Sequence, residues 1–121
     1  MAKLILVVDD SASLRQVVAL TLKGAGYDVI EASDGADALA KLTGQRVSLV
    51  ISDVNMPNMD GFTFVNELKK NPTYKNAPVI MLTTEVADDK KKAGQAAGAK
   101  AWMVKPFQPK QMLAAVEKLA M

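Results

Sequence analysis

Hydrophobic residues along the chain gather in short runs that are separated by longer segments of mixed polarity. The runs are too short for helices and are rich in β-branched residues, which predicts buried strands. They cover residues 4–8, 27–32, 47–52, 78–83 and 99–104. The run over 27–32 alternates only weakly and contains Asp28 and Glu31, so we expect this strand to be less buried than the others.

The segments between these runs carry hydrophobic residues at helical spacing, and most have recognisable start and stop signals. The first helix is expected to be capped by Ser11 or Ser13 and to end at Gly24 and Gly26. Its predicted buried face consists of Leu14, Val17, Val18, Thr21, Leu22 and Ala25. Further helices are predicted from the cap Asp34 to the stop at Gly44, over residues 61–70, over 86–97, and from Pro109 onwards.

Strands and helices alternate from one end of the chain to the other. Such alternation with short connections implies a parallel sheet that is covered by helices on both faces. Right-handed crossovers then restrict the topology to a few doubly wound arrangements. In these sheets, ligands bind at the carboxyl ends of the strands, near the point where the strand order reverses. The sequence therefore predicts one α/β domain over residues 1–121, with its site at this edge.

The composition excludes several kinds of chemistry. The 121 residues include no cysteine and no histidine, so disulfides, thiol catalysis and imidazole chemistry within the chain are excluded. The net charge of +2 is too weak to argue for nucleic acid, and no DNA partner is expected. The first segment has a short apolar run that two aspartates end, so neither a signal peptide nor a membrane span is predicted. We therefore expect a cytoplasmic protein that does not bind membranes.

Polar residues follow the predicted strands where these reach the carboxyl edge of the sheet. They are Asp9 and Asp10 after the first strand, Asp53 after the third, Thr83 and Thr84 at the fourth, and Lys105 after the fifth. Three carboxylates in one place repel one another unless a cation joins them, and a single lysine supplies only one positive charge. We therefore expect a Mg²⁺ site, because Mg²⁺ accepts a few carboxylates together with water.

A phosphoryl-transfer site fits these residue types. Mg²⁺ and a lysine together neutralise the charge of a phosphoryl group, and a carboxylate can act as the nucleophile and form an aspartyl phosphate. Asp53 is the candidate nucleophile because it ends the central strand, while Asp9 and Asp10 would hold the metal. Each residue alone has an ordinary explanation, such as a helix cap, an Asx-turn or a solvated lysine. Their convergence at one edge favours a functional site.

Four motifs give the chain a resemblance to the receiver domains of bacterial two-component systems. They are VVDDS at 7–11, DVNMPNMDG at 53–61, MLTTE at 81–85 and VKPF at 104–107. The resemblance extends over the whole chain and points to stand-alone receivers of the chemotaxis type, the CheY-like proteins. It implies a flavodoxin-like, five-stranded parallel sheet in which the strands, numbered along the chain, lie in the order 2-1-3-4-5.

The resemblance also implies roles for the acidic residues. Asp53 would be the phosphoacceptor and would receive phosphate from the phosphohistidine of a separate histidine kinase. Asp10, Asp53 and the backbone carbonyl of Asn55 would contact Mg²⁺, and Asp9 would act mainly through water. Asn55 would also border the bound phosphate.

The remaining site residues are assigned by the same resemblance. Lys105 would contact the phosphoryl oxygens, and Thr83 would move towards them on activation, with Thr84 beside the phosphate. Trp102 occupies the aromatic switch position and would turn inward when Thr83 moves. The peptide bond between Lys105 and Pro106 is expected to be cis, which would position the lysine.

The expected function is a signalling switch whose chemistry is limited to its own phosphotransfer and autodephosphorylation, and not an enzyme. We expect a monomer without an output domain, so the signal would leave through the surface of the helix over 86–97, the strand over 99–104 and the last helix. This surface carries Lys90, Lys91, Lys92, Lys100 and Lys110 beside Trp102. The lysines favour an acidic partner, such as a flagellar motor switch or another chemotaxis component.

Other functions remain open at this point. A flavodoxin-like FMN protein would share the architecture, although Asp9 and Asp10 would repel an unclamped phosphate. A haloacid-dehalogenase-type phosphatase also uses an aspartyl phosphate but expects a second aspartate two residues further on, where this chain has Asn55. The receiver could also serve as a phosphorelay intermediate, or as a scaffold that works without phosphorylation.

Overall fold

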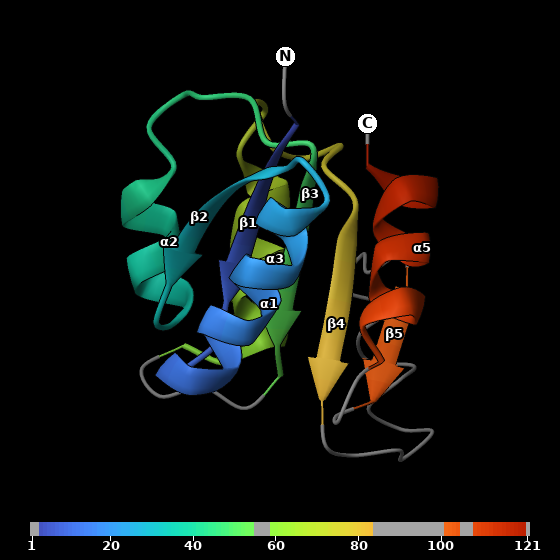
Figure 1. Ribbon diagram of the computed structural model, residues 1–121. Helices are drawn as coiled ribbons and strands as arrows, with labels where there is room; N and C mark the ends of the chain where they lie inside the picture. The colour runs from blue at the N-terminus through green and yellow to red at the C-terminus, as the bar shows by residue number, and fades with distance from the viewer. Residues whose placement is uncertain (1–2, 55–58, 84–100, 105–107, 121) are drawn as a thin grey trace.

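The computed structural model describes residues 3–54, 59–83, 101–104 and 108–120. Within these ranges the strands are β1 (Leu4–Val8), β2 (Asp28–Ala32), β3 (Leu49–Asp53), β4 (Val79–Thr83) and β5 (Ala101–Val104). They form one parallel sheet in the order β2-β1-β3-β4-β5. The predicted fold class and strand order are therefore confirmed. The strands run in the same direction, and their carboxyl ends point to the lower edge of the molecule in Figure 1.

The described helices are α1 (Ala12–Gly24), α2 (Gly35–Lys41), α3 (Gly61–Lys70) and α5 (Pro109–Leu119). Three of them begin with a side-chain cap, in which Ser11, Asp34 or Asp60 accepts a hydrogen bond from a backbone N–H of the first turn. Helix α5 instead has proline in its first turn, where no intrahelical N–H donor is needed. The helix predicted over 86–97 lies outside the described residues.

Successive residues of the strands point to opposite faces of the sheet and build two separate cores. On one face, Leu6 of β1 packs in a cluster with Phe64 of α3, and α2 contributes to the same cluster. On the other face, Ile5 packs in a cluster with Leu22 of α1 and Met112 of α5. Figure 1 shows α1 and α5 in front of the sheet and α3 behind it. Helices therefore cover both faces of the sheet.

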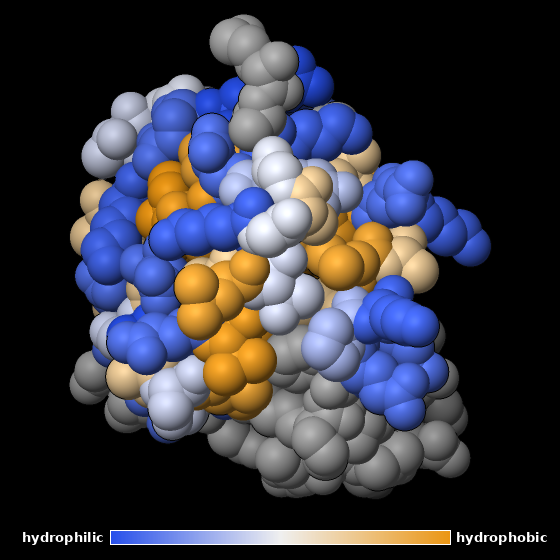
Figure 2. Space-filling view, in the orientation of Figure 1, coloured by the Kyte–Doolittle hydropathy of each residue, from blue (hydrophilic) through white to orange (hydrophobic). Residues whose placement is uncertain are grey.

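The predicted buried face of α1 is wrong at two positions. Val17 is 49 % exposed, and Ala25, which caps the helix, is exposed as well. The buried stripe consists of Val18, Ala19 and Leu22. Leu20, which is not part of the predicted face, is 69 % exposed. A helix that lies on a sheet buries only a narrow stripe, and Val17 lies about 140–160° around the helix from Leu22 and Ala19. Figure 2 shows hydrophobic residues exposed on the front of the molecule, where α1 lies in Figure 1.

The strand boundaries differ slightly from the predicted ones. Strand β2 begins at Asp28, β3 at Leu49 and β4 at Val79, one or two residues later than the apolar runs suggest. Strand β3 also includes Asp53 as its last residue, so this carboxylate is held by the sheet itself. In the described part of the chain, no helix is both long enough and apolar enough to span a bilayer.

Candidate functional site

Two neighbouring strands bring three aspartates together at the carboxyl edge of the sheet. Asp9 and Asp10 follow β1, Asp53 ends β3, and Val8 pairs in register with Ser52 across the two strands. As a result, one carboxylate oxygen from each of Asp9, Asp10 and Asp53 lies within 4.8 Å of the other two. The predicted convergence of these residues is confirmed.

The cluster combines burial with strong mutual repulsion. Asp9 is 2 % exposed and Asp53 is 6 % exposed, whereas Asp10 faces solvent. Two ionised carboxylates about 5 Å apart repel by about 3 kcal/mol at an effective dielectric constant of about 20. A cation bound between them would remove this cost.

The donor set fits Mg²⁺. Mg²⁺ takes oxygen ligands at about 2.1 Å in octahedral geometry, so two of its ligands are about 3 to 4 Å apart. Carboxylate oxygens within 4.8 Å of one another need only a small movement, or a bridging water, to reach that geometry. Asp10, the exposed member of the cluster, is in contact with solvent.

Asp53 is held firmly at the end of β3. The backbone N–H of Val54 donates to Asp53 Oδ1 at 2.8 Å, and the buried hydroxyl of Ser52 donates to the Asp53 carbonyl at 2.9 Å. The first residue of α3 closes over the same backbone, because Gly61 N donates to the Val54 carbonyl at 2.8 Å. These contacts fix both the main chain and the carboxylate of the candidate nucleophile.

Asp9 is held at three atoms. Its N–H donates to the Ala32 carbonyl of β2 at 3.1 Å, and its Oδ1 accepts from Ser11 N at 2.9 Å. Its carbonyl oxygen accepts a hydrogen bond of 2.7 Å from Arg15 Nη1 of α1. Strand β2, helix α1 and the connecting turn therefore all position this residue.

The other predicted site residues are placed only in part. Thr83 ends β4 and pairs in register with Val104, while Trp102 lies in β5 opposite Met81. The main chain of Thr83 and Trp102 is thus located in the two strands beyond β3 in the sheet. The predictions for Asn55, Thr84, Lys105 and Pro106, including the cis peptide bond, lie outside the described residues.

Three residues around the site are not among those predicted from the sequence. They are Arg15, Ser52 and Gly61. A serine within an apolar run, directly before the candidate nucleophile, is a signal that could have pointed to Ser52. A glycine that opens a helix immediately after an aspartate cap could have pointed to a close backbone contact. Arg15 is one basic residue of a helix, and its contact depends on the tertiary fold.

The fold and the acidic cluster together define a doubly wound α/β protein with a candidate metal centre at the carboxyl edge of its sheet. The profile of the response regulator receiver domain family matches residues 5–117. The chain therefore belongs to this family and is a receiver domain of two-component signalling.

Individual relatives agree with this assignment. The chemotaxis protein CheY4 of Vibrio cholerae is 47 % identical and superposes with a TM-score of 0.94, and the match covers 98 % of this chain and 99 % of that one. Protein PilG of Pseudomonas aeruginosa is 35 % identical over 93 % of this chain and 84 % of its own length. The Pyropia yezoensis protein named "Probable transcriptional regulator ycf27" is 42 % identical over 95 % of this chain, but over only 46 % of its own length. The similarity is thus to a CheY-like receiver.

Proposed function

We propose that this receiver is a phosphorylation-activated switch in which Asp53 accepts a phosphoryl group from the phosphohistidine of a histidine kinase. The observation that supports the proposal most directly is the set of carboxylate oxygens from Asp9, Asp10 and Asp53 within 4.8 Å. Asp53 is the proposed acceptor because it ends β3, the middle strand of the sheet. The chain has no histidine, so the phosphohistidine must come from a partner.

The proposed transfer needs a carboxylate in a fixed orientation. A carboxylate oxygen of Asp53 bonds to phosphorus while the P–N bond of the phosphohistidine breaks and the imidazole leaves with the bonding pair. The hydrogen bond from Val54 N to Asp53 Oδ1 helps to fix the carboxylate, and a fixed reacting group favours the transfer. When bound, Mg²⁺ neutralises charge on the phosphoryl oxygens. Asp10, Asp53 and the Asn55 carbonyl are the proposed ligands, and Asp9 is proposed to act through water.

The residues at the ends of β4 and β5 are proposed to bind and sense the phosphoryl group. Lys105 would neutralise its oxygens, with Thr83 and Thr84 as hydroxyl donors and a cis Lys105–Pro106 bond that directs the lysine. The pairing of Thr83 with Val104, directly before Lys105, supports this grouping. Trp102 of β5 would respond when Thr83 moves.

The proposed output is a change of surface and not catalysis of an external reaction. Phosphorylation would bias an existing equilibrium at residues 86–97, β5 and α5, and thereby change affinity for a downstream partner. The similarity to a chemotaxis protein supports a chemotaxis component as that partner. We further propose that the protein is a cytoplasmic monomer that binds neither DNA nor membranes.

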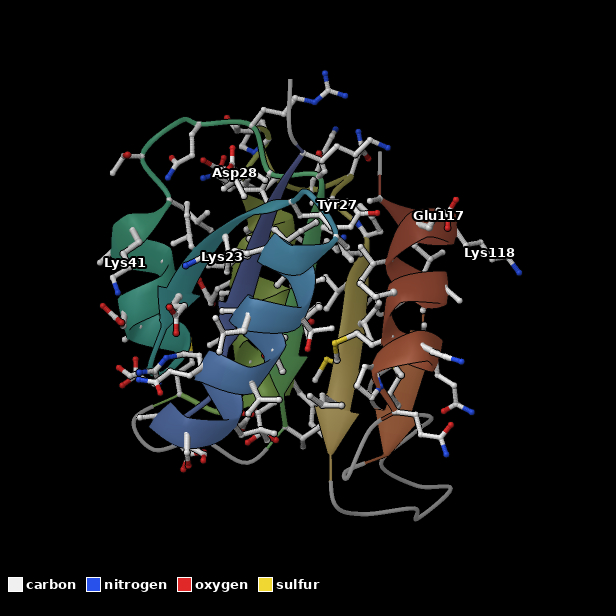
Figure 3. All side chains as sticks on the ribbon, in the orientation of Figure 1. Lys23, Tyr27, Asp28, Lys41, Glu117 and Lys118 are labelled. Atoms are coloured by element: carbon white, nitrogen blue, oxygen red, sulfur yellow. The ribbon has the colours of Figure 1, made fainter. Side chains whose placement is uncertain are left out.

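Incubation with Mg²⁺ and acetyl phosphate, followed by intact-mass measurement, tests the acceptor. The parent protein should gain one phosphoryl group, and Asp53→Asn should gain none. Asp28→Asn is the matched control, because Asp28 is an exposed aspartate at the start of β2, at the opposite edge of the sheet (Figure 3). This control should be phosphorylated like the parent. Normal phosphorylation of Asp53→Asn would show that the acceptor is another residue.

A binding assay with the beryllofluoride-treated and untreated protein tests the proposed output. Stronger binding of a chemotaxis-type partner after treatment is the expected result. Equal binding in both states would favour a scaffold that does not depend on phosphorylation. Transfer of the phosphoryl group onward to a histidine phosphotransfer protein would instead identify a phosphorelay intermediate.

A further inference from the structure

Arg15 forms a bridge between the acidic cluster and strand β2. Its Nη1 donates to the Asp9 carbonyl at 2.7 Å, and its Nε lies 3.4 Å from Glu31 Oε1. The side chain is 18 % exposed, and its buried Nε makes no hydrogen bond to any described residue. The contact with Glu31 is therefore one of charge, while the short bond to Asp9 is a charge-assisted hydrogen bond.

The atom that Arg15 holds also determines where Asp10 lies. A peptide unit is planar, so the Asp9 carbonyl is rigidly connected to the nitrogen and Cα of Asp10. When Arg15 fixes the Asp9 carbonyl, it also fixes the positions of the Asp10 nitrogen and Cα, from which the Asp10 side chain extends. Asp10 is the exposed member of the cluster, so this backbone restraint compensates for the packing that its own side chain lacks.

We infer that Arg15 is a positioning residue that orients the Asp9–Asp10 peptide for Mg²⁺ binding, and that Glu31 holds Arg15 in place. The inference rests on the proposed function, because it concerns the same acidic cluster. Arginine suits this role because its planar guanidinium presents several donors in a rigid fork, so one nitrogen can serve Asp9 while another faces Glu31. Lysine carries its donors on one nitrogen, so it cannot place separate nitrogens on the two partners.

Positioning and simple electrostatics predict opposite results for metal binding. If Arg15 acted only through its charge, its removal would strengthen the attraction of the three carboxylates for a cation. If it positions the Asp9–Asp10 peptide, its removal disorders the ligands and weakens binding. Residues that orient metal ligands typically change metal affinity by about 10- to 100-fold. The sign of the effect therefore separates the two roles.

Direct binding of Mn²⁺, a spectroscopic substitute for Mg²⁺, tests the inference. Electron paramagnetic resonance measures free Mn²⁺ in titrations of the parent, Arg15→Met, Arg15→Lys and Glu31→Gln. We expect Arg15→Met to bind about tenfold more weakly and Arg15→Lys to bind more weakly although it keeps the charge. Glu31→Gln should show a smaller loss. Lys23→Met is the charge control, since Lys23 is an exposed cation at the far end of the same helix (Figure 3), and its affinity should equal or exceed that of the parent.

Affinity equal to or tighter than that of the parent in folded Arg15→Met or Arg15→Lys would overturn the inference. If Arg15 only braced α1 against β2, its substitution would lower the free energy of unfolding and leave Mn²⁺ affinity unchanged, which would also contradict the inference. If Arg15→Met does not fold, Arg15→Lys still decides because it keeps the charge, with circular dichroism as the check of folding. If the parent itself binds no Mn²⁺, both the proposed metal site and this inference fail. If the parent and the variants bind Mn²⁺ equally, only the inference fails.

Discussion

A methyl group on Gly61 would lie 2.2 Å from the carbonyl oxygen of Asp53. It would also lie 3.0 Å from the Val54 Cα, so the obstruction is backbone and not the end of a flexible side chain. The first residue of α3 thus packs directly on the end of β3. The hydrogen bond from Gly61 N to the Val54 carbonyl, 2.8 Å long, uses the same close approach. The start of α3 is therefore part of the support for the candidate nucleophile.

Gly61→Ala should damage stability and phosphorylation together. The added methyl must move either the end of β3 or α3, and overpacking of this kind costs about 1–3 kcal/mol. Displacement of Asp53 should slow phosphorylation by acetyl phosphate about tenfold or more, because reactive groups tolerate little misplacement. Urea unfolding and the rate of phosphoryl incorporation measure the two effects.

Gly24→Ala is the matched control for that substitution. A methyl at Gly24, the last residue of α1, meets nothing within 4 Å. Alanine should leave the phosphorylation rate unchanged and should leave stability unchanged or raise it by about 0.5–1 kcal/mol. Parent-like stability and rate in Gly61→Ala would show that the end of β3 is not held as tightly as the geometry indicates.

Asp10→Asn should stabilise the metal-free protein and weaken Mg²⁺ binding. Asp10 is the exposed member of a repulsive cluster, so loss of its charge relieves repulsion without leaving a buried group unpaired. We expect a gain of about 1 kcal/mol in EDTA. With excess Mg²⁺ the parent should gain stability through ligand binding, and the variant should gain much less. Unfolding in urea with EDTA, and again with Mg²⁺, measures both effects.

Two further variants complete the comparison with Asp10→Asn. In Asp9→Asn the amide oxygen can still accept the bond from Ser11 N, so we expect a smaller loss of Mg²⁺ binding. Asp28→Asn, at the opposite edge of the sheet, should match the parent with and without Mg²⁺. A destabilised Asp10→Asn in EDTA would contradict the proposed repulsion.

The sequence was sufficient to predict the fold because its signals are local and repeated. Apolar runs, caps such as Asp34 and Asp60, and alternation along the chain determine the parallel sheet. It also predicted the meeting of Asp9, Asp10 and Asp53, because the carboxyl ends of parallel strands share one edge. The strand order came from family resemblance, since periodicity does not distinguish one doubly wound order from another.

The errors and omissions involve tertiary contacts. Val17 has the spacing of a buried residue, but α1 buries too narrow a stripe to include it. Arg15 donates to the Asp9 carbonyl, and Gly61 packs against the Asp53 carbonyl. Both contacts form only in the folded chain. No pattern in the sequence alone indicates which backbone carbonyl an arginine or a glycine will approach.

Tyr74→Phe should reduce stability without affecting the metal site. The Tyr74 hydroxyl donates to the Gln45 carbonyl at 3.0 Å and accepts from Gly44 N at 3.0 Å, and the residue is 2 % exposed. These groups lie before β3 and β4, at the opposite edge from the aspartates. Loss of the hydroxyl leaves two partly buried backbone groups without this partner and should cost about 1–3 kcal/mol. Urea unfolding measures the cost, and Mn²⁺ affinity should stay at the parent value; a change in affinity would show that the two edges are coupled.

Asp37 should contribute stability that disappears in acid. The backbone N–H of Ser33 donates to Asp37 Oδ2 at 3.0 Å, and Lys41 Nζ lies 3.1 Å from the same oxygen (Lys41 is labelled in Figure 3). These contacts, with the Ser33 hydrogen bond as the largest cause, lower the pKa of Asp37 below its ordinary value of 3.8. A lowered pKa in the folded state means that the contribution is fully present above the ordinary value and is lost as the pH falls through the folded value.

Asp37→Asn tests this contribution. Because the Asp37 side chain is 34 % exposed and solvent screens its charge, the variant should lose only about 0.5 kcal/mol at neutral pH. The difference from the parent should shrink below about pH 4 and vanish once Asp37 is protonated. Urea midpoints across this range measure it. If the stability difference between Asp37→Asn and the parent is the same at neutral and acid pH, the effect comes from the changed side chain itself and not from the Asp37 charge.

Trp102 should report activation by a change in fluorescence. It is the only tryptophan in the sequence, so the emission comes from one site in β5. Strand β5 pairs with β4, and Thr83 at the end of β4 is proposed to move towards the phosphoryl group. Addition of beryllofluoride with Mg²⁺ should therefore shift the Trp102 emission in the parent and leave Asp53→Asn unchanged. If the parent binds beryllofluoride by calorimetry and its emission stays constant, Trp102 is not a switch residue, although Asp53 remains the acceptor.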